Sequence, residues 1–192
     1  KIVNKIKDLK IKYIFLSSRK VYKHNANLKE SSKCKPLDNY AKNKLITENK
    51  IKLIIKNRYL ILRISNIIGE PINNPKKVTN NFIDKYLQFK KSKMIIAYKN
   101  YYKDFLSINQ FTEIFYNIIR SKIMGTYNVS LGEKVYISEI LLWLSKSNNK
   151  IFKPINKFIN DDSFYLNNKK LLNKINIKIK KSDLKKYCQN FN

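Results

Sequence analysis

The chain has 192 residues, of which 43% are hydrophobic and 12% aromatic, so it can form one domain of ordinary size, or a small pair, around a buried core. Lys and Arg together number 41 against 13 Asp and Glu, which gives a formal net charge of +28. With only three Gly and four Pro, the composition excludes collagen-like and low-complexity architectures, and its hydrophobic content argues against a disordered tail.

The first half of the chain predicts two buried strands joined by a long helix. Ile2–Leu9 has apolar side chains at helical spacing, and Tyr13–Leu16 is a short continuous apolar run that ends in two serines. A polar loop over 23–38 leads to residues 40–56, which lack Gly and Pro and carry apolar residues near the helical period. A second buried run follows at Tyr59–Ile64. Strands that are buried on both faces and joined by a helix predict a parallel sheet with a right-handed crossover.

The second half predicts mostly helices around one further strand. Apolar spacing, turn residues and capping signals place these elements. In chain order we expect a helix around 82–89, a helix over Ile108–Ile119, a strand over Gly125–Val129, a helix over Ile140–Leu144 with Ser138 as its N-cap, a short helix near Lys169–Leu172, and a last helix capped by Ser182.

The cysteines and the single histidine limit the chemistry. Cys34 and Cys188 form neither a disulfide framework nor a set of metal ligands, so we expect a reducing, cytoplasmic compartment and no metal site. His24 is interpreted as an exposed loop residue without a role. No uncharged apolar run approaches the roughly 18 residues that a membrane span needs, so we expect no membrane association.

A serine, a tyrosine and a lysine form the candidate reaction site. Ser18 follows the first buried strand, and Tyr40 and Lys44 lie one turn apart on the helix that comes next. Residues i and i+4 share a helix face, so the ammonium of Lys44 can favour the phenolate of Tyr40 and prepare it to act as a general base or acid. Ligands of open parallel sheets bind beyond the carboxyl ends of the strands, where Ser18 can hydrogen-bond the same substrate oxygen.

The Tyr-x-x-x-Lys spacing is weak evidence by itself. In a chain with 13 Tyr and an excess of Lys, chance produces this spacing more than once, and it also begins at Tyr86 and at Tyr165. Only the pair that begins at Tyr40 follows a buried strand ending in serine and precedes a second buried strand. The structural alternative is a surface helix that carries an aromatic ring and a charge one turn apart.

Several segments together resemble a known enzyme family. They are, in chain order, Phe15–Tyr22, Glu30, Pro36, Tyr40–Lys44, Glu48, Leu62–Gly69, Lys103–Ile108, Gly125–Ser130 and Ser138–Ile140. In this order and spacing they look like the extended short-chain dehydrogenase/reductases, and within them they are most similar to the NAD-dependent epimerase/dehydratases that act on nucleotide sugars. The resemblance covers nearly the whole chain.

The resemblance implies a catalytic and cofactor-binding role for four residues. Ser18, Tyr40 and Lys44 would be catalytic, with Tyr40 taking a proton from a sugar hydroxyl while the carbon beneath it passes hydride to the nicotinamide of NAD or NADP. Tyr40 and Lys44 would also contact the cofactor, Lys44 by holding the nicotinamide ribose. Ser65 would lie against the nicotinamide end. Two long helices, one of them carrying Tyr40, would form a homodimer interface.

On the substrate side the resemblance is less complete. Asn66 and Lys103 would face a nucleotide-sugar substrate together with Ser18, and Lys103 would contact its diphosphate. Lys103 stands where Arg is usual, so it keeps the charge but loses the bidentate fork. Asp161 and Asp162 occupy a region where the family often offers another Arg. These departures bear on the substrate rather than on the family.

The predicted fold is α/β: the C-terminal part of a Rossmann-like parallel sheet and a smaller α/β substrate-binding domain. Residues 1–70 would form the second half of the dinucleotide-binding (Rossmann) domain and residues 71–192 the substrate-binding domain, with about 104–130 returning to the Rossmann sheet. The family's first strands and its glycine-rich turn, G-x-x-G-x-x-G, are absent, and the chain begins at Lys1 rather than Met. We therefore expect a fragment of a longer protein that is inactive alone.

Two other functions stay open on the sequence. One is a keto-sugar reductase of the dTDP-4-dehydrorhamnose type, which consumes reduced cofactor where an epimerase recycles it. The other, from a different class, is a basic nucleic-acid-binding module, which the charge of +28 suggests. However, only four of the 41 basic residues are Arg, and the Lys excess accompanies many Ile and Asn residues, as an A/T-biased genome favours. We therefore expect a nucleotide-sugar enzyme without a nucleic-acid partner.

Overall fold

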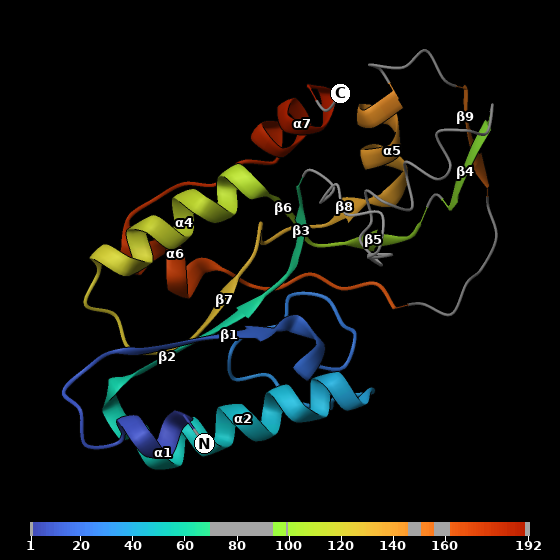
Figure 1. Ribbon diagram of the computed structural model, residues 1–192. Helices are drawn as coiled ribbons and strands as arrows, with labels where there is room; N and C mark the ends of the chain where they lie inside the picture. The colour runs from blue at the N-terminus through green and yellow to red at the C-terminus, as the bar shows by residue number, and fades with distance from the viewer. Residues whose placement is uncertain (1, 70–93, 99, 146–150, 156–161, 191–192) are drawn as a thin grey trace, which may run out of the picture.

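The computed structural model describes residues 2–69, 94–98, 100–145, 151–155 and 162–190 (Figure 1). A three-stranded parallel sheet lies at its centre, in the order β1 (Tyr13–Ser18), β2 (Tyr59–Ile64) and β7 (Gly125–Val129). Leu60 of β2 pairs with Ile14 on one side and with Gly125 on the other. The predicted strands and their parallel arrangement are confirmed.

Helices cover both faces of this sheet, as Figure 1 shows. α1 (Ile2–Ile6) and α2 (Asn39–Ile55) lie on one face, and α4 (Ile108–Arg120) and α6 (Lys169–Ile175) lie on the other. The helices predicted in these four places are confirmed. A sheet between two layers of helices is the α/β architecture expected from the order of elements.

Successive side chains of β2 point to opposite faces of the sheet, so they join two different hydrophobic cores. On the α2 side, Ile61 packs with Ile51 and Ile55. On the α4 side, Leu60 and Leu62 join the larger core. Because both faces of β2 are covered, its apolar run is continuous rather than interrupted by polar residues. Burial of each of these side chains contributes about 1.5–3 kcal/mol.

The rest of the described chain adds short strand pairs and further helices. β3 (Asn66–Ile68) pairs with β6 (Phe105–Ser107) and β4 (Met94–Tyr98) with β9 (Ile151–Ile155), both parallel, and β5 (Tyr102–Lys103) pairs antiparallel with β8 (Val135–Tyr136). The remaining helices are α5 (Ile137–Ser145), α7 (Lys181–Gln189) and the 3-10 turns η1 (Arg19–Val21) and η2 (Lys56–Arg58). No helix in the described ranges is long and apolar enough to cross a membrane.

Two predicted helix caps are wrong. α5 begins one residue before Ser138, which therefore lies inside the helix. The carboxylate of Glu139 instead accepts a 2.9 Å hydrogen bond from the backbone N–H of Tyr136, as the third residue of a capping box does. α7 has Lys180 as its N-cap, and Ser182 lies in its first turn. A hydroxyl near a helix start is a weaker signal than the backbone geometry that selects the cap.

Two other predictions concern the stretch 70–93. The helix expected around 82–89 lies outside the described residues, and so does the chain that follows the expected domain boundary at residue 70. β7, which falls within 104–130, pairs with β2 of the central sheet. The division into two domains stays a prediction.

β1 is an edge strand of the described sheet. It pairs with β2 on one side, and its Leu16 is 43% exposed although the strand is a continuous apolar run. Strands of this composition are normally covered on both faces, and an uncovered strand edge is a template for pairing. The open edge of β1 can therefore accept another strand.

Candidate active site

The carboxyl ends of the three parallel strands lie at one edge of the sheet, and each is marked by a serine. Ser18 ends β1, Ser65 follows β2, and Ser130 follows β7. Ligands of open parallel sheets bind at this edge, in the crevice between the loops. The predicted site residues Ser18 and Ser65 thus lie at the ends of neighbouring strands.

Ser17 and Ser18 point in opposite directions because side chains alternate along a strand. Ser17 is buried, and its hydroxyl donates a 2.6 Å hydrogen bond to Oε1 of Glu48 in α2. Ser18 is half-buried and caps η1, where its Oγ accepts a 3.2 Å bond from the backbone N–H of Lys20. The bond of Ser17 thus attaches the end of β1 to α2, and Ser18 keeps a hydroxyl proton that it can donate.

Tyr40 lies in the first turn of α2, whose start is fixed by Asp38. The carboxylate of Asp38 accepts a 2.7 Å bond from the backbone N–H of Ala41, and this bond, together with one from Lys20, holds the pKa of Asp38 below its ordinary value. Lys44, one turn further along, places its Nζ 5.5 Å from the centroid of the Tyr40 ring. The structure therefore brings the tyrosine and the lysine together.

Lys44 also connects α2 to β1. Its Nζ donates a 2.8 Å hydrogen bond to the carbonyl oxygen of Leu16 and lies 4.9 Å from the centroid of the Phe15 ring. An ammonium has three donors, so others can serve a ligand. The chain thus holds the lysine at the edge of β1, where Leu16 is exposed.

Lys20 contacts both Ser18 and Tyr40. The backbone N–H of Lys20 binds Ser18, and its Nζ lies 5.8 Å from the centroid of the Tyr40 ring. Tyr40 is 53% exposed, and within the described ranges its hydroxyl makes no hydrogen bond to Ser18 or Lys44. The catalytic roles of these residues stay a prediction.

Ser65 and Asn66 are held at the end of β2 by backbone contacts. The N–H of Ser65 donates a 3.0 Å bond to the carbonyl of Val129, and Asn66 donates from its N–H and its Nδ2 to the carbonyl of Asp104. The hydroxyl of Ser65 is buried near the carboxylate of Asp104 but makes no hydrogen bond of normal geometry in the described part of the chain. A buried hydroxyl left unsatisfied costs about 1–3 kcal/mol. Ser65 therefore suits a polar group that arrives with a ligand.

Asp104 is fully buried and holds the loops behind this edge. Its carboxylate accepts hydrogen bonds from the backbone N–H groups of Leu131 (2.8 Å), Leu166 (3.1 Å) and Gly132 (3.2 Å). Burial raises the pKa of Asp104 to about 7, although these bonds and the nearby Ser65 hydroxyl favour the carboxylate. Asp104 thus fixes the chain after β7 and before α6.

Lys103, expected to face the substrate, is turned toward an internal partner. Its Nζ lies 2.8 Å from Oδ2 of Asp162, and the hydroxyl of Tyr101 donates to the other oxygen of the same carboxylate. Although partial burial opposes it, these two bonds hold the pKa of Asp162 below its ordinary value. The charge of Lys103 is thus engaged within the protein, and its contact with a substrate stays a prediction. Asp161 lies outside the described residues.

A buried ion pair lies directly behind the site. Nη2 of Arg63 lies 2.6 Å from Oε2 of Glu48, and its Nε bonds both carboxylate oxygens at 3.1 and 3.2 Å. Nη1 of Arg63 donates to the hydroxyl of Tyr22 (2.7 Å), which in turn donates to Oδ1 of Asn128 (2.9 Å). Burial alone would lower the pKa of Arg63, but its bonds with Glu48 raise it, and burial raises the pKa of Tyr22 to about 12. This network joins α2, β2 and β7.

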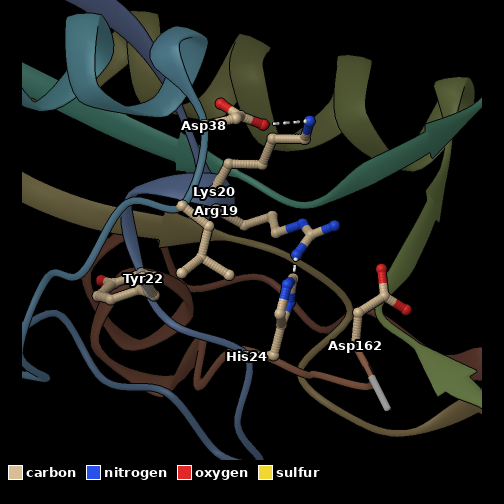
Figure 2. A pocket seen from close by; sticks show the side chains of 7 residues that line it. Arg19, Lys20, Tyr22, His24, Asp38 and Asp162 are labelled. Carbon is tan, nitrogen blue, oxygen red and sulfur yellow. Dashed lines mark hydrogen bonds and ion pairs between the residues drawn. The ribbon is translucent and has the colours of Figure 1, made fainter. Parts of the chain in front are cut away.

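A pocket of about 220 Å³ lies around Arg19 and Lys20, the two residues that follow Ser18 (Figure 2). It is lined by Arg19, Lys20, Tyr22, His24, Leu37, Asp38 and Asp162. His24, expected to be exposed, is half-buried, and Nη1 of Arg19 lies 3.0 Å from its Nδ1. Arg19 was not expected at the site, and its position directly after Ser18 is the sequence signal that could have indicated it.

The family model described as "NAD dependent epimerase/dehydratase family" matches residues 1–130 of this chain. This match and the parallel sheet between helices bear out the resemblance and the fold class expected from the sequence motifs. No curated protein sequence matches the chain.

Several solved structures share the fold. A UDP-N-acetylglucosamine 4-epimerase from Methanobrevibacter ruminantium M1, in complex with UDP-N-acetylmuramic acid, is 23% identical over 97% of this chain and 63% of its own, with a TM-score of 0.75. A dTDP-4-dehydrorhamnose reductase from Yersinia enterocolitica is 21% identical over 100% of this chain and 70% of its own, with a TM-score of 0.76. A UDP-glucuronic acid 4-epimerase from Bacillus cereus, in complex with NAD, is 22% identical over 98% of this chain and 62% of its own, with a TM-score of 0.76. The chain thus spans 63% of the length of the first of these structures.

Proposed function

We propose that this chain, which belongs to the NAD dependent epimerase/dehydratase family, forms the larger part of an NAD(P)-dependent nucleotide-sugar epimerase or dehydratase. The observation that carries this proposal is the pairing of Tyr40 with Lys44 on one side of α2, beside Ser18 at the carboxyl edge of a parallel sheet. A base, a cation that stabilises it and a hydroxyl donor are the groups that proton transfer to and from a sugar hydroxyl requires.

In this proposal Tyr40 moves the proton and Ser18 orients the hydroxyl. Tyr40 acts as the phenolate, which the positive Nζ of Lys44, 5.5 Å from the ring centroid, stabilises; its oxygen takes the proton of the sugar hydroxyl and becomes a neutral phenol. Ser18, whose Oγ accepts from Lys20, donates its own proton to the same sugar oxygen. Because Tyr40 is half exposed, a ligand can reach its hydroxyl directly.

The residues present fit NAD or NADP. The buried, unpartnered hydroxyl of Ser65 suits a polar group at the nicotinamide end, and Lys44 has donors beyond its bond to Leu16 for the ribose hydroxyls. Tyr40 lies beside Lys44 and would contact the same end of the cofactor. The nicotinamide, when bound, supplies the hydride transfer. The NAD in the Bacillus cereus structure supports this choice of cofactor.

We propose a nucleotide sugar as the substrate. The relatives from Methanobrevibacter and Bacillus support it, since the one is in complex with a uridine-diphosphate sugar and the other is named for one. Asn66 would face the sugar with its Oδ1, because its Nδ2 is held by the carbonyl of Asp104. Lys103 would contact the diphosphate while it stays paired with Asp162.

We further propose that the glycine-rich phosphate-binding turn lies on strands of a longer protein that pair with the open edge of β1. Within the described ranges β1 is hydrogen-bonded to β2 on one side only, and this supports the arrangement. Ile46 and Leu53, both exposed on α2, support a homodimer formed through that helix. The cytoplasmic location stays a prediction.

The test is Tyr40→Phe in the full-length protein. We expect kcat for nucleotide-sugar conversion to fall by at least about 100-fold, because general acid–base catalysis is lost, while NAD binding measured by fluorescence quenching is retained. Tyr165→Phe is the matched control, since Tyr165 also stands four residues before a lysine but outside the site. Full activity of Tyr40→Phe would overturn the mechanism.

A keto-sugar reductase of the same family is the second candidate. The Yersinia enterocolitica reductase, whose fold spans this chain completely, favours it. The two are separated by following the reduced cofactor during turnover. Net consumption of reduced cofactor identifies a reductase, whereas product formation without net consumption identifies an epimerase or dehydratase.

A further inference from the structure

Arg19 is a buried cation without a carboxylate partner. It is 7% exposed, and none of the ion pairs in the described ranges includes it. Its guanidinium lies 3.9 Å from the centroid of the Phe164 ring, and its Nη1 lies 3.0 Å from Nδ1 of His24. A buried charge normally has a counter-charge, because its desolvation is costly. Arg19 therefore keeps the capacity to bind an anion.

The two carboxylates that line the pocket are already paired. Asp38 lies 2.9 Å from Nζ of Lys20, and Asp162 lies 2.8 Å from Nζ of Lys103. Both carboxyls have a pKa below the ordinary value, so both are ionised near neutral pH and each balances one lysine. Burial lowers the pKa of Arg19, although the negative charge of Asp162 opposes this. Of these three cations, Arg19 is the one that has no carboxylate in an ion pair with it.

The pocket borders the proposed reaction site. Arg19 directly follows Ser18, and Nζ of the next residue, Lys20, lies 5.8 Å from the centroid of the Tyr40 ring. Figure 2 shows the guanidinium of Arg19 in the middle of the pocket, with the pair of Lys20 and Asp38 beside it. A group bound here would therefore belong to the part of the sugar nearest the hydroxyl that meets Tyr40.

We propose that this pocket binds a carboxylate carried by the sugar of the substrate, with Arg19 as its counter-charge; this rests on the proposed function. The substrate class is then a uronic acid or another carboxylated sugar nucleotide. The planar fork of a guanidinium matches the two oxygens of a carboxylate. A cavity of about 220 Å³ is smaller than those that enclose whole ligands, so it takes one end of the substrate.

A carboxylate fits this pocket better than the diphosphate of the substrate does. After Lys20 and Lys103 have paired with their carboxylates, one positive charge remains, and it balances one negative charge. A diphosphate on Arg19 would bring a second negative charge, and the described lining of the pocket offers no second cation without a carboxylate partner.

The test measures binding rather than turnover. The full-length protein and its Arg19→Gln variant are titrated in a calorimeter with UDP-glucuronic acid and with UDP-glucose, which differ in the carboxylate. We expect the unmodified protein to bind the uronic acid at least about tenfold more tightly, and Arg19→Gln to lose this preference. An unchanged Kd for UDP-glucose shows that the variant is folded.

Lys20→Gln is the matched control. Lys20 lines the same pocket, but its side chain is 46% exposed and already paired with Asp38. We expect this variant to keep the preference for the uronic acid within about twofold, because exposed pairs contribute little. Arg19→Lys, which keeps the charge and loses the fork, should retain part of the preference. If Lys20→Gln loses it as fully as Arg19→Gln, the assignment to Arg19 is wrong.

The remaining outcomes separate this inference from the proposed function. Equal affinities of the unmodified protein for the two nucleotide sugars, or equal losses in Arg19→Gln, overturn the carboxylate site and leave the proposed function intact. UDP alone is the third probe: if Arg19→Gln weakens UDP as much as UDP-glucuronic acid, Arg19 binds the diphosphate and the inference is wrong. If neither UDP nor either nucleotide sugar binds, the proposed function fails.

Discussion

Two buried arginines at the carboxyl edge of the sheet differ in what holds them. Arg63 in β2 is 3% exposed and forks onto the carboxylate of Glu48, whereas Arg19 in η1 is 7% exposed and contacts the rings of His24 and Phe164. Burial opposes the charge of both, but the bonds with Glu48 raise the pKa of Arg63, and that of Arg19 stays lowered. The guanidinium of Arg63 is used within the protein, whereas that of Arg19 faces a pocket.

The largest effect is expected at Glu48. Glu48→Ala leaves Arg63 buried without a counter-charge and Ser17 without its acceptor. We expect the free energy of unfolding to fall by about 3–5 kcal/mol, as when one partner of a buried pair is removed. Urea denaturation of this chain measures it.

Lys52→Ala is the control for Glu48→Ala. Nζ of Lys52 lies 3.9 Å from the same carboxylate at a side-chain exposure of 37%, so its removal should cost less than about 0.5 kcal/mol. If the two variants lose the same amount, the carboxylate of Glu48 is not what holds Arg63.

The next largest effect is expected at Tyr22, whose hydroxyl hydrogen-bonds Arg63 in the same buried network. Tyr22→Phe keeps the buried ring but removes the hydroxyl that accepts from Arg63 and donates to Asn128. We expect a loss of about 1–3 kcal/mol in the free energy of unfolding, because two buried groups lose a partner. Tyr116→Phe is the matched control, since its hydroxyl also accepts from an arginine but is exposed on α4. Equal losses would show that burial does not decide the difference.

The features of the fold that could be predicted from the sequence are those that neighbouring residues determine. β1 and β2 could be predicted because a continuous apolar run is stable only where both faces are covered, and β2 is covered by α2 and α4. The pairing of Tyr40 with Lys44 could also be predicted, because helix geometry alone brings residues i and i+4 together.

The pocket could not be predicted because its parts meet only in the folded chain. Asp162 and His24 are far apart in the sequence, and neither belongs to a regular element whose period would place it. The partner of Lys103 could not be predicted for the same reason, since the ion pair with Asp162 joins distant segments. Similarly, Glu48 and Arg63 were recognised as part of a family pattern, but their contact depends on how α2 packs on β2.

Asp104 is a third buried charged group, and its hydrogen-bond partners are backbone N–H groups rather than a side chain of opposite charge. Because burial raises the pKa of Asp104 from 3.8 to about 7, the folded chain keeps a proton in this window that the unfolded chain has released. The stability that this group contributes is therefore full below pH 3.8 and is lost as the pH rises toward 7. We expect the free energy of unfolding to fall by up to about 1.4 kcal/mol per pH unit from this group.

The measurement is urea denaturation of the unmodified chain and of Asp104→Asn across this pH window. Asn does not titrate, so its profile should lack the decline that Asp104 adds. The comparison uses slopes, because Asn keeps only one of the two acceptor oxygens, which serve Leu131 on one side and Gly132 and Leu166 on the other, and so lowers stability at every pH. Parallel profiles would contradict the raised pKa.

Arg19 itself should give the smallest effect on stability. Arg19→Gln gives up the contact with His24 and the stack on Phe164, but it also removes a buried cation whose desolvation no carboxylate offsets. These contributions oppose each other, so we expect a loss of at most about 1 kcal/mol in the ligand-free chain, against about 3–5 kcal/mol for Glu48→Ala. A loss as large as that of Glu48→Ala would show that Arg19 is a structural cation like Arg63, and it would leave no unused charge for an anion in the pocket.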